Sequence, residues 1–157
     1  MRLIRSALLT ILVTAVVGCE KFDCQWDKPD VDLVRDYQGK DLTSLYDAHL
    51  KFTSRCTPSR TTLAPLVAEF GPQARSYAIS RIKNGNYRSL QAALAVTAHV
   101  TAKYDSDCLP TERERLLQAI QYLSVPTRSN EVIRKGVMRS CSTKAARSPM
   151  NLEDYAG

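Results

Sequence analysis

The side chains of this 157-residue chain that are best able to do chemistry are five cysteines and two histidines. No two cysteines have the Cys-x-x-Cys spacing that is typical of zinc ribbons and redox enzymes. The sequence also contains no Gly-x-Ser-x-Gly elbow, no His-Glu-x-x-His motif and no glycine-rich phosphate loop. We therefore predict no catalytic residue and no cofactor.

Both histidines are expected to be packed residues rather than catalytic bases. His49 falls on the apolar face of a helix that begins near residue 41, and His99 stands among alanines of a later helix. A hydrolase would need one of them beside a carboxylate such as Asp47 or Glu69. Asp47 and His49 are two positions apart, which places them on different faces of a helix. A small periplasmic cell-wall hydrolase is therefore the alternative function.

One short acidic stretch could begin a calcium loop. Asp105 and Asp107 flank a serine, as in the first positions of such loops. The next residues, Cys108-Leu109-Pro110, stand where further oxygen ligands and a glycine are required. We predict no metal site.

The N-terminus has the organisation of an export signal. The opening MRLIR carries two arginines and no acid, and residues 7–17 are apolar apart from two threonines. Eleven helical residues rise only about 16 Å, roughly half the thickness of the bilayer core. The segment is therefore predicted to be a cleaved signal peptide rather than a membrane anchor.

The signal ends in Val16-Val17-Gly18-Cys19, which resembles the lipobox of bacterial lipoproteins. The resemblance implies that the thiol of Cys19 receives a diacylglyceryl group, that the chain is cut before this residue, and that the new N-terminus is acylated. Two or three acyl chains anchor a protein stably to a membrane. The residue after the cysteine is Glu20 rather than an aspartate. In such families this implies that the protein is sorted to the outer membrane, facing the periplasm. Inner-membrane anchoring, and secretion after cleavage without lipid, stay open as alternatives.

The other four cysteines form an even set in an exported chain, which predicts two disulfides. Short loops make successive helices antiparallel, so the helices before Cys108 and Cys141 should end on the same side of the bundle. Cys56 would then lie at the opposite end, where Cys24 on the N-terminal arm can reach it. We predict the bridges Cys108–Cys141 and Cys24–Cys56.

Apolar spacing predicts an all-α fold, a single small irregular bundle of five or six helices that two disulfides staple together. The helices are expected from residue 41 (capped by Asp41), from 62, from 72, at about 87–104, from a capping box at Thr111, and from Ser129. The predicted organisation is a signal peptide over 1–18, an acidic tether over 19–40, a helical domain over 41–141 and a disordered tail over 142–157.

Charge is distributed unevenly along the chain. From residue 19 onward there are twenty basic and sixteen acidic residues, and between residues 51 and 104 eight bases face a single acid, Glu69. The export signal argues against a nucleic-acid partner. An acidic protein, anionic lipid or lipopolysaccharide, and the acidic N-terminal arm itself could each meet a basic face here, and a solvated face with no partner is a further reading. The candidate residues for this face are Arg55, Arg60, Arg75, Arg81, Lys83 and Arg88.

The segment CLPTERERLLQAIQYLSVPTR, residues 108–128, together with Cys141, loosely resembles small periplasmic immunity proteins of type VI secretion. Those proteins carry Cys-x-Pro, a threonine, then Tyr-Leu and a final cysteine, with longer spacings than this chain has. Taken together, the sequence predicts a periplasmic lipoprotein that acts as a protein-binding or adaptor module of the pilotin, exclusion or immunity type. Its expected contacts are the membrane, through the lipid, and a protein of the envelope.

Overall fold

A computed structural model describes residues 22–124 and 127–144 of the chain. The predicted signal peptide, Cys19 and the part of the predicted tail beyond residue 144 lie outside these residues. Within the described part, no helix combines the length and the apolar character needed to cross a membrane.

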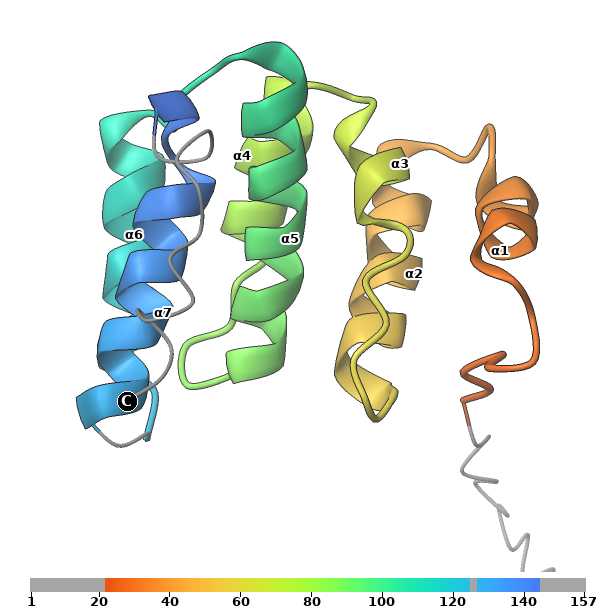
Figure 1. The fold of residues 1–157 in the computed structure, drawn as a ribbon, viewed down its shortest axis with the longest axis horizontal. Helices are drawn as coiled ribbons and strands as arrows, with labels where there is room; N and C mark the ends of the chain where they lie inside the picture. Colours follow the sequence, from red (N-terminus) through yellow and green to blue (C-terminus); the bar gives the residue numbers. More distant parts are fainter. Residues whose placement is uncertain (1–21, 125–126, 145–157) are drawn as a thin grey trace, which may run out of the picture.

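The described residues form an all-helical fold, as predicted, and contain no strand (Figure 1). Six helices fall close to the expected positions, and a seventh, α1, lies in the N-terminal arm. The helices are α1 (Asp30–Tyr37), α2 (Leu42–Arg55), α3 (Ala64–Ala68), α4 (Pro72–Ser80), α5 (Tyr87–Tyr104), α6 (Pro110–Gln121) and α7 (Thr127–Ser140).

The longest helix, α5, is the centre of the bundle. It packs against α2, α3, α4 and α7 (Figure 1). Its sequence is apolar or small on nearly every side, which suits a helix surrounded by others. Leu90, Ala93, Val96 and Val100 are completely buried.

Several helix ends follow directly from the sequence. Asp41 accepts a hydrogen bond from the backbone N–H of Ser44 at 3.0 Å, and Asn86 caps α5 in the same way by accepting from Ser89 at 2.9 Å. Before α4, Gly71 has a φ of +70°, a backbone conformation that glycine adopts without strain.

Two predicted helix caps were placed too late in the chain. Helix α6 begins at Pro110, not after Thr111, because proline fits the first helical turn and Glu112 reaches back to the N–H of Leu109 at 2.9 Å. Ser129 lies inside α7, which begins at Thr127.

The arm that the sequence predicted as a tether is structured over its described residues. Pro29 precedes the first turn of α1, where its fixed φ is compatible with a helix start. The side chain of Leu33 is completely buried in the core. Phe22 packs edge-on against Phe52 of α2, with ring centroids 5.0 Å apart. The arm therefore belongs to the folded body from residue 22 onward.

The two disulfides are those predicted, Cys24–Cys56 and Cys108–Cys141, with Cα–Cα distances of 5.7 and 4.8 Å. Their placement follows from the antiparallel order of the helices. Cys108 and Cys141 follow the C-terminal ends of α5 and α7 at one end of the bundle, and Cys56 follows α2 at the other (Figure 1). Each bridge closes a loop of similar length, with sequence separations of 32 and 33 residues.

Candidate binding pocket beside the Cys24–Cys56 disulfide

The six predicted basic residues do not form one exposed face. Arg75 is only 2% exposed, and its Nε donates to Glu112 at 2.9 Å while its other nitrogens donate to the carbonyls of Ser106 and Asp107. Arg60 is 7% exposed and is likewise enclosed by acceptors. These two arginines are structural because burying a guanidinium requires partners for its charge and its N–H groups.

The other four members remain near the surface. Arg81 forms an ion pair with Asp47, with an N–O distance of 3.0 Å. Arg55, Lys83 and Arg88 have no carboxylate partner among the described residues. Three of the six predicted basic residues are thus paired with acids of the same chain, and the acidic arm supplies one of these acids, Asp30.

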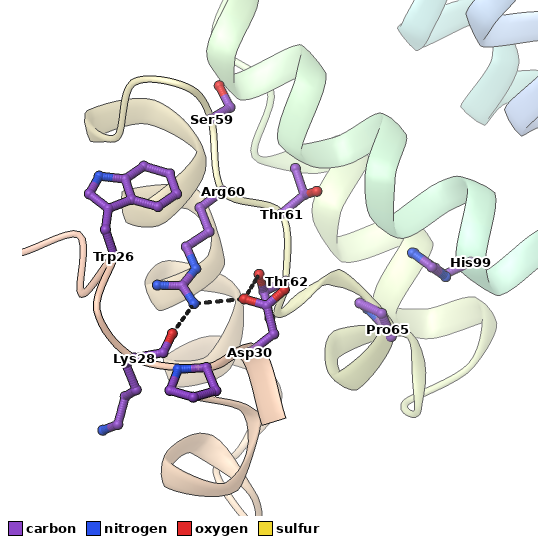
Figure 2. A pocket seen from close by; sticks show the side chains of 10 residues that line it. Trp26, Lys28, Asp30, Ser59, Arg60, Thr61, Thr62, Pro65 and His99 are labelled. Carbon is purple, nitrogen blue, oxygen red and sulfur yellow. Dashed lines mark hydrogen bonds and ion pairs between the residues drawn. The ribbon is translucent and has the colours of Figure 1, made fainter. Parts of the chain in front are cut away.

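An open pocket of about 610 Å³ lies where the N-terminal arm, the loop between α2 and α3, and helix α5 meet (Figure 2). Its lining combines one large aromatic ring with hydroxyl groups and charged groups. The residues are Trp26, Lys28, Pro29, Asp30, Ser59, Arg60, Thr61, Thr62, Pro65 and His99.

Arg60 holds the arm in place along this pocket. Its Nη1 donates to the carbonyls of Cys24 and Gln25, and its Nη2 donates to the carbonyl of Lys28 at 2.8 Å. The same Nη2 donates to the carboxylate of Asp30 at 2.6 Å (Figure 2). One side chain therefore fixes four successive points of the arm, next to the disulfide that joins the arm to α2.

Asp30 is an acceptor that is kept ionised. The hydrogen bond from Arg60, and then that from the Thr62 hydroxyl at 2.9 Å, hold the pKa of this carboxyl below its usual value of 3.8. A carboxylate with a lowered pKa is poorly suited to donate a proton as a general acid at neutral pH. It is suited to accept hydrogen bonds from a ligand.

Trp26 supplies the apolar surface of the pocket. The ring is 52% exposed, and the guanidinium of Arg60 lies 5.5 Å from its centroid. This cation–π contact and the neighbouring Cys24 bridge orient the ring without burying it. An exposed, oriented tryptophan is the kind of side chain that anchors protein interfaces.

The two histidines have different environments. His49 is completely buried, as predicted, and its Nε2 lies 3.0 Å from the carbonyl oxygen of Ala92. Burial lowers the pKa of His49 from 6.5 to about 4, which keeps the ring neutral. The prediction was wrong for His99, which is exposed and lines the pocket on the α5 side (Figure 2). Partial burial lowers the pKa of His99.

The groups that line the pocket are suited to binding a ligand, and they do not form a catalytic arrangement that we recognise. The described residues contain no cluster of three or more histidine, cysteine, aspartate or glutamate side chains that could hold a metal ion. Asp30 is engaged by Arg60 and Thr62, and His99 comes from another element of the pocket (Figure 2). Hydroxyl, carboxylate and aromatic groups together can hydrogen-bond and pack against a peptide.

Our sequence analysis named Arg60 and His99 but did not group them with Trp26, Asp30 and Thr62. A signal for the grouping was present. Once Cys24 is paired with Cys56, the residues that follow each cysteine must run close to one another. Eight of the ten lining residues come from these two stretches, 24–30 and 56–62, and the other two are Pro65 and His99.

No protein-family model matches this chain, and neither a curated protein nor a solved structure matches it significantly.

Proposed function

We propose that this protein is an exported lipoprotein, anchored at the periplasm-facing outer membrane through Cys19, and that its helical domain binds a protein partner. The observation that carries the proposal is that the cysteines fall into two groups, four in disulfides and Cys19 apart from them. Four of the five pair with one another, so neither disulfide requires Cys19. Disulfides persist in oxidising compartments such as the periplasm, and the lipobox assigns the remaining cysteine a separate use.

The partner surface in this proposal is the pocket beside Trp26. A short extended segment of another envelope protein could pack an apolar side chain on Trp26 and hydrogen-bond to Asp30 and the neighbouring hydroxyl groups. The clamp made by Arg60 supports this choice, because a preorganised surface loses less conformational entropy when it binds.

Pilotin, exclusion and immunity roles all fit a binding domain held at a membrane. The resemblance of residues 108–128, together with Cys141, to periplasmic immunity proteins favours the immunity type among them.

A cell-wall hydrolase is the second candidate, because His99 and Asp30 line the same pocket. The lowered pKa of Asp30 and its hydrogen bonds from Arg60 and Thr62 favour binding over acid catalysis. Incubation of the purified protein with peptidoglycan decides between them. If the wild-type protein releases soluble fragments and the His99→Ala variant does not, the protein is a hydrolase and the binding proposal is wrong.

Membrane fractionation tests the anchor. Wild-type protein is expected in the outer-membrane fraction, whereas Cys19→Ala should lose this association because it lacks the acylated thiol. Gly18→Ser is the matched control, since it keeps a small residue before the cysteine and should remain anchored. Equal membrane association of the Cys19→Ala protein would contradict lipidation.

Site-specific photo-crosslinking tests the binding surface in the intact envelope. A cross-linking residue at position 61, which lines the pocket, should give a discrete product that Trp26→Ala reduces. The control position is Val31, which is exposed on α1 but does not line the pocket. No product at position 61, or a product that Trp26→Ala leaves unchanged, would exclude this pocket as the partner site.

A further inference from the structure

The folded body begins very close to the predicted lipid attachment point. Phe22 already packs against Phe52 of α2 and belongs to the surroundings of the core. Three residue steps separate Cys19 from Phe22, and a fully extended chain covers at most about 11 Å in three steps. If Cys19 is acylated, as the proposed function requires, the end of the bundle that carries Phe22 must lie against the membrane.

That end contains three of the predicted basic residues. Arg55 is at the C-terminus of α2, with its guanidinium 5.9 Å from the centroid of the Phe22 ring. Arg88, in the first turn of α5, donates to Ser59, which follows α2 in the chain. Lys83 is exposed in the loop that leads to α5. The C-terminus of α2 and the start of α5 thus lie together, at the lower end of the bundle in Figure 1.

Two exposed tyrosines complete this surface. Tyr87 is the first residue of α5 and Tyr122 follows α6; they are 44% and 52% exposed. Arg115 of α6 donates to the carbonyl of Ile82 and to Asn84, which ties α6 to the loop before α5. We define the basal surface as Arg55, Lys83, Tyr87, Arg88 and Tyr122.

The chemistry of the basal surface matches an anionic lipid surface. Basic side chains are attracted to anionic headgroups, and tyrosine is enriched at membrane–water interfaces because its ring is amphipathic. Asp23 is an acid close to this surface, and its carboxylate accepts the N–H of Gln25 at 2.8 Å. The three cations therefore outweigh the acid beside them.

We propose that the basal surface lies on anionic lipid headgroups and fixes the orientation of the domain. The acyl chains supply the anchoring energy, and the basal cations select which end faces the bilayer. The pocket beside Trp26 then opens on the side of the bundle, along the loop between α2 and α3, where a periplasmic partner can reach it.

Hydroxyl-radical footprinting of the full acylated protein tests this orientation. The protein is reconstituted into vesicles of phosphatidylcholine, with or without phosphatidylglycerol. Tyr87 and Tyr104 are an internal comparison, because they are the first and last residues of α5 and are 44% and 40% exposed. Oxidation of Tyr87 and Tyr122 should fall several-fold on the anionic vesicles, and that of Tyr104 should not change. High salt should reverse the protection.

A charge-reversed variant gives the matched control. Arg55→Glu combined with Lys83→Glu changes two exposed side chains and should abolish the protection while the protein still sediments with vesicles. Unprotected tyrosines in the wild type, or equal protection on both kinds of vesicle, would overturn the orientation. Protection of these tyrosines only in native envelopes would also overturn the orientation, because the basal surface would then contact a protein. Failure to sediment at all would instead refute the acyl anchor of the proposed function.

Discussion

The two ends of the molecule use the same combination of a disulfide and an arginine, but they differ in how exposed the arginine's carboxylate partner is. The closed clamp joins Arg75 to Glu112 beside Cys108–Cys141, and Glu112 is 7% exposed. The open clamp joins Arg60 to Asp30 beside Cys24–Cys56, and the side chain of Asp30 is 70% exposed. The closed clamp satisfies its own polar groups, whereas the open clamp leaves an oriented carboxylate and a tryptophan facing solvent. The closed clamp is therefore structural, whereas the open clamp also presents a surface that is suited to binding.

Removal of the buried carboxylate gives the largest expected effect. Glu112→Ala leaves the charge of Arg75 buried without its ion-pair partner and should lower the free energy of unfolding by about 3–5 kcal/mol. Asp30→Ala should cost less, about 1–2 kcal/mol, because water can replace its exposed carboxylate and the buried Arg60 keeps three backbone carbonyl acceptors. Urea denaturation of both variants measures the difference. Equal losses would remove the distinction between the two clamps.

Removal of either disulfide should cost a similar amount, because the loops they close are nearly equal in length. The chain-entropy model gives about 4 kcal/mol for each. Hydrogen exchange distinguishes them by location. Cys24→Ala with Cys56→Ala should speed exchange in α1, and Cys108→Ala with Cys141→Ala should do so at the C-terminal end of α7. Loss of protection over the whole chain in the first variant would show that the arm does not open separately.

Acid should weaken the core between the two clamps through His49. Its pKa is 6.5 in the unfolded chain and about 4 in the folded one, so between these values only the unfolded chain is protonated. Stability is therefore complete above pH 6.5 and falls as the pH approaches 4, by about 3 kcal/mol. His49→Gln should flatten this part of the stability profile. The control is His99→Gln, because His99 is exposed. An equal flattening of the stability profile in this variant would argue against burial of His49 as the cause.

The smallest expected change in stability is at Trp26. Because the ring is half exposed, Trp26→Ala should cost only about 0.5–1 kcal/mol through the lost contact with Arg60. Binding of the envelope partner should fall far more than stability does, as titration of the purified partner would measure. A large loss of stability with unchanged affinity would reassign Trp26 to the structural part of the open clamp.

The sequence was informative where a local pattern decides the structure. The periodicity of α2 and α5, the cap Asp41 and the even set of four cysteines were enough to predict an all-α bundle and both disulfides. Helix α1 was missed because eight residues are too few to show a sustained helical period, and the helix is stabilised by packing of Leu33 into the core.

The prediction of a single basic face failed because the structure there depends on contacts between residues far apart in the chain. Arg60 and Arg75 look like their exposed neighbours in the sequence, because nothing local reveals that Asp30 and Glu112 will fold against them. Their burial depends on contacts 30 and 37 residues apart in the chain. The open clamp also depends on such a distant contact, although the predicted Cys24–Cys56 bridge already indicated that the two stretches of chain around it lie close together.

The most direct test of the account is the intact mass of the mature protein purified from a bacterial envelope without reduction. The expected mass is that of a chain that begins at Cys19, with a diacylglyceryl group and an N-terminal acyl chain added, and with the hydrogens of two disulfides removed. Peptide mapping should then recover the pairs Cys24–Cys56 and Cys108–Cys141. A chain that still carries Met1, an unmodified Cys19, or a disulfide that includes Cys19 would contradict it.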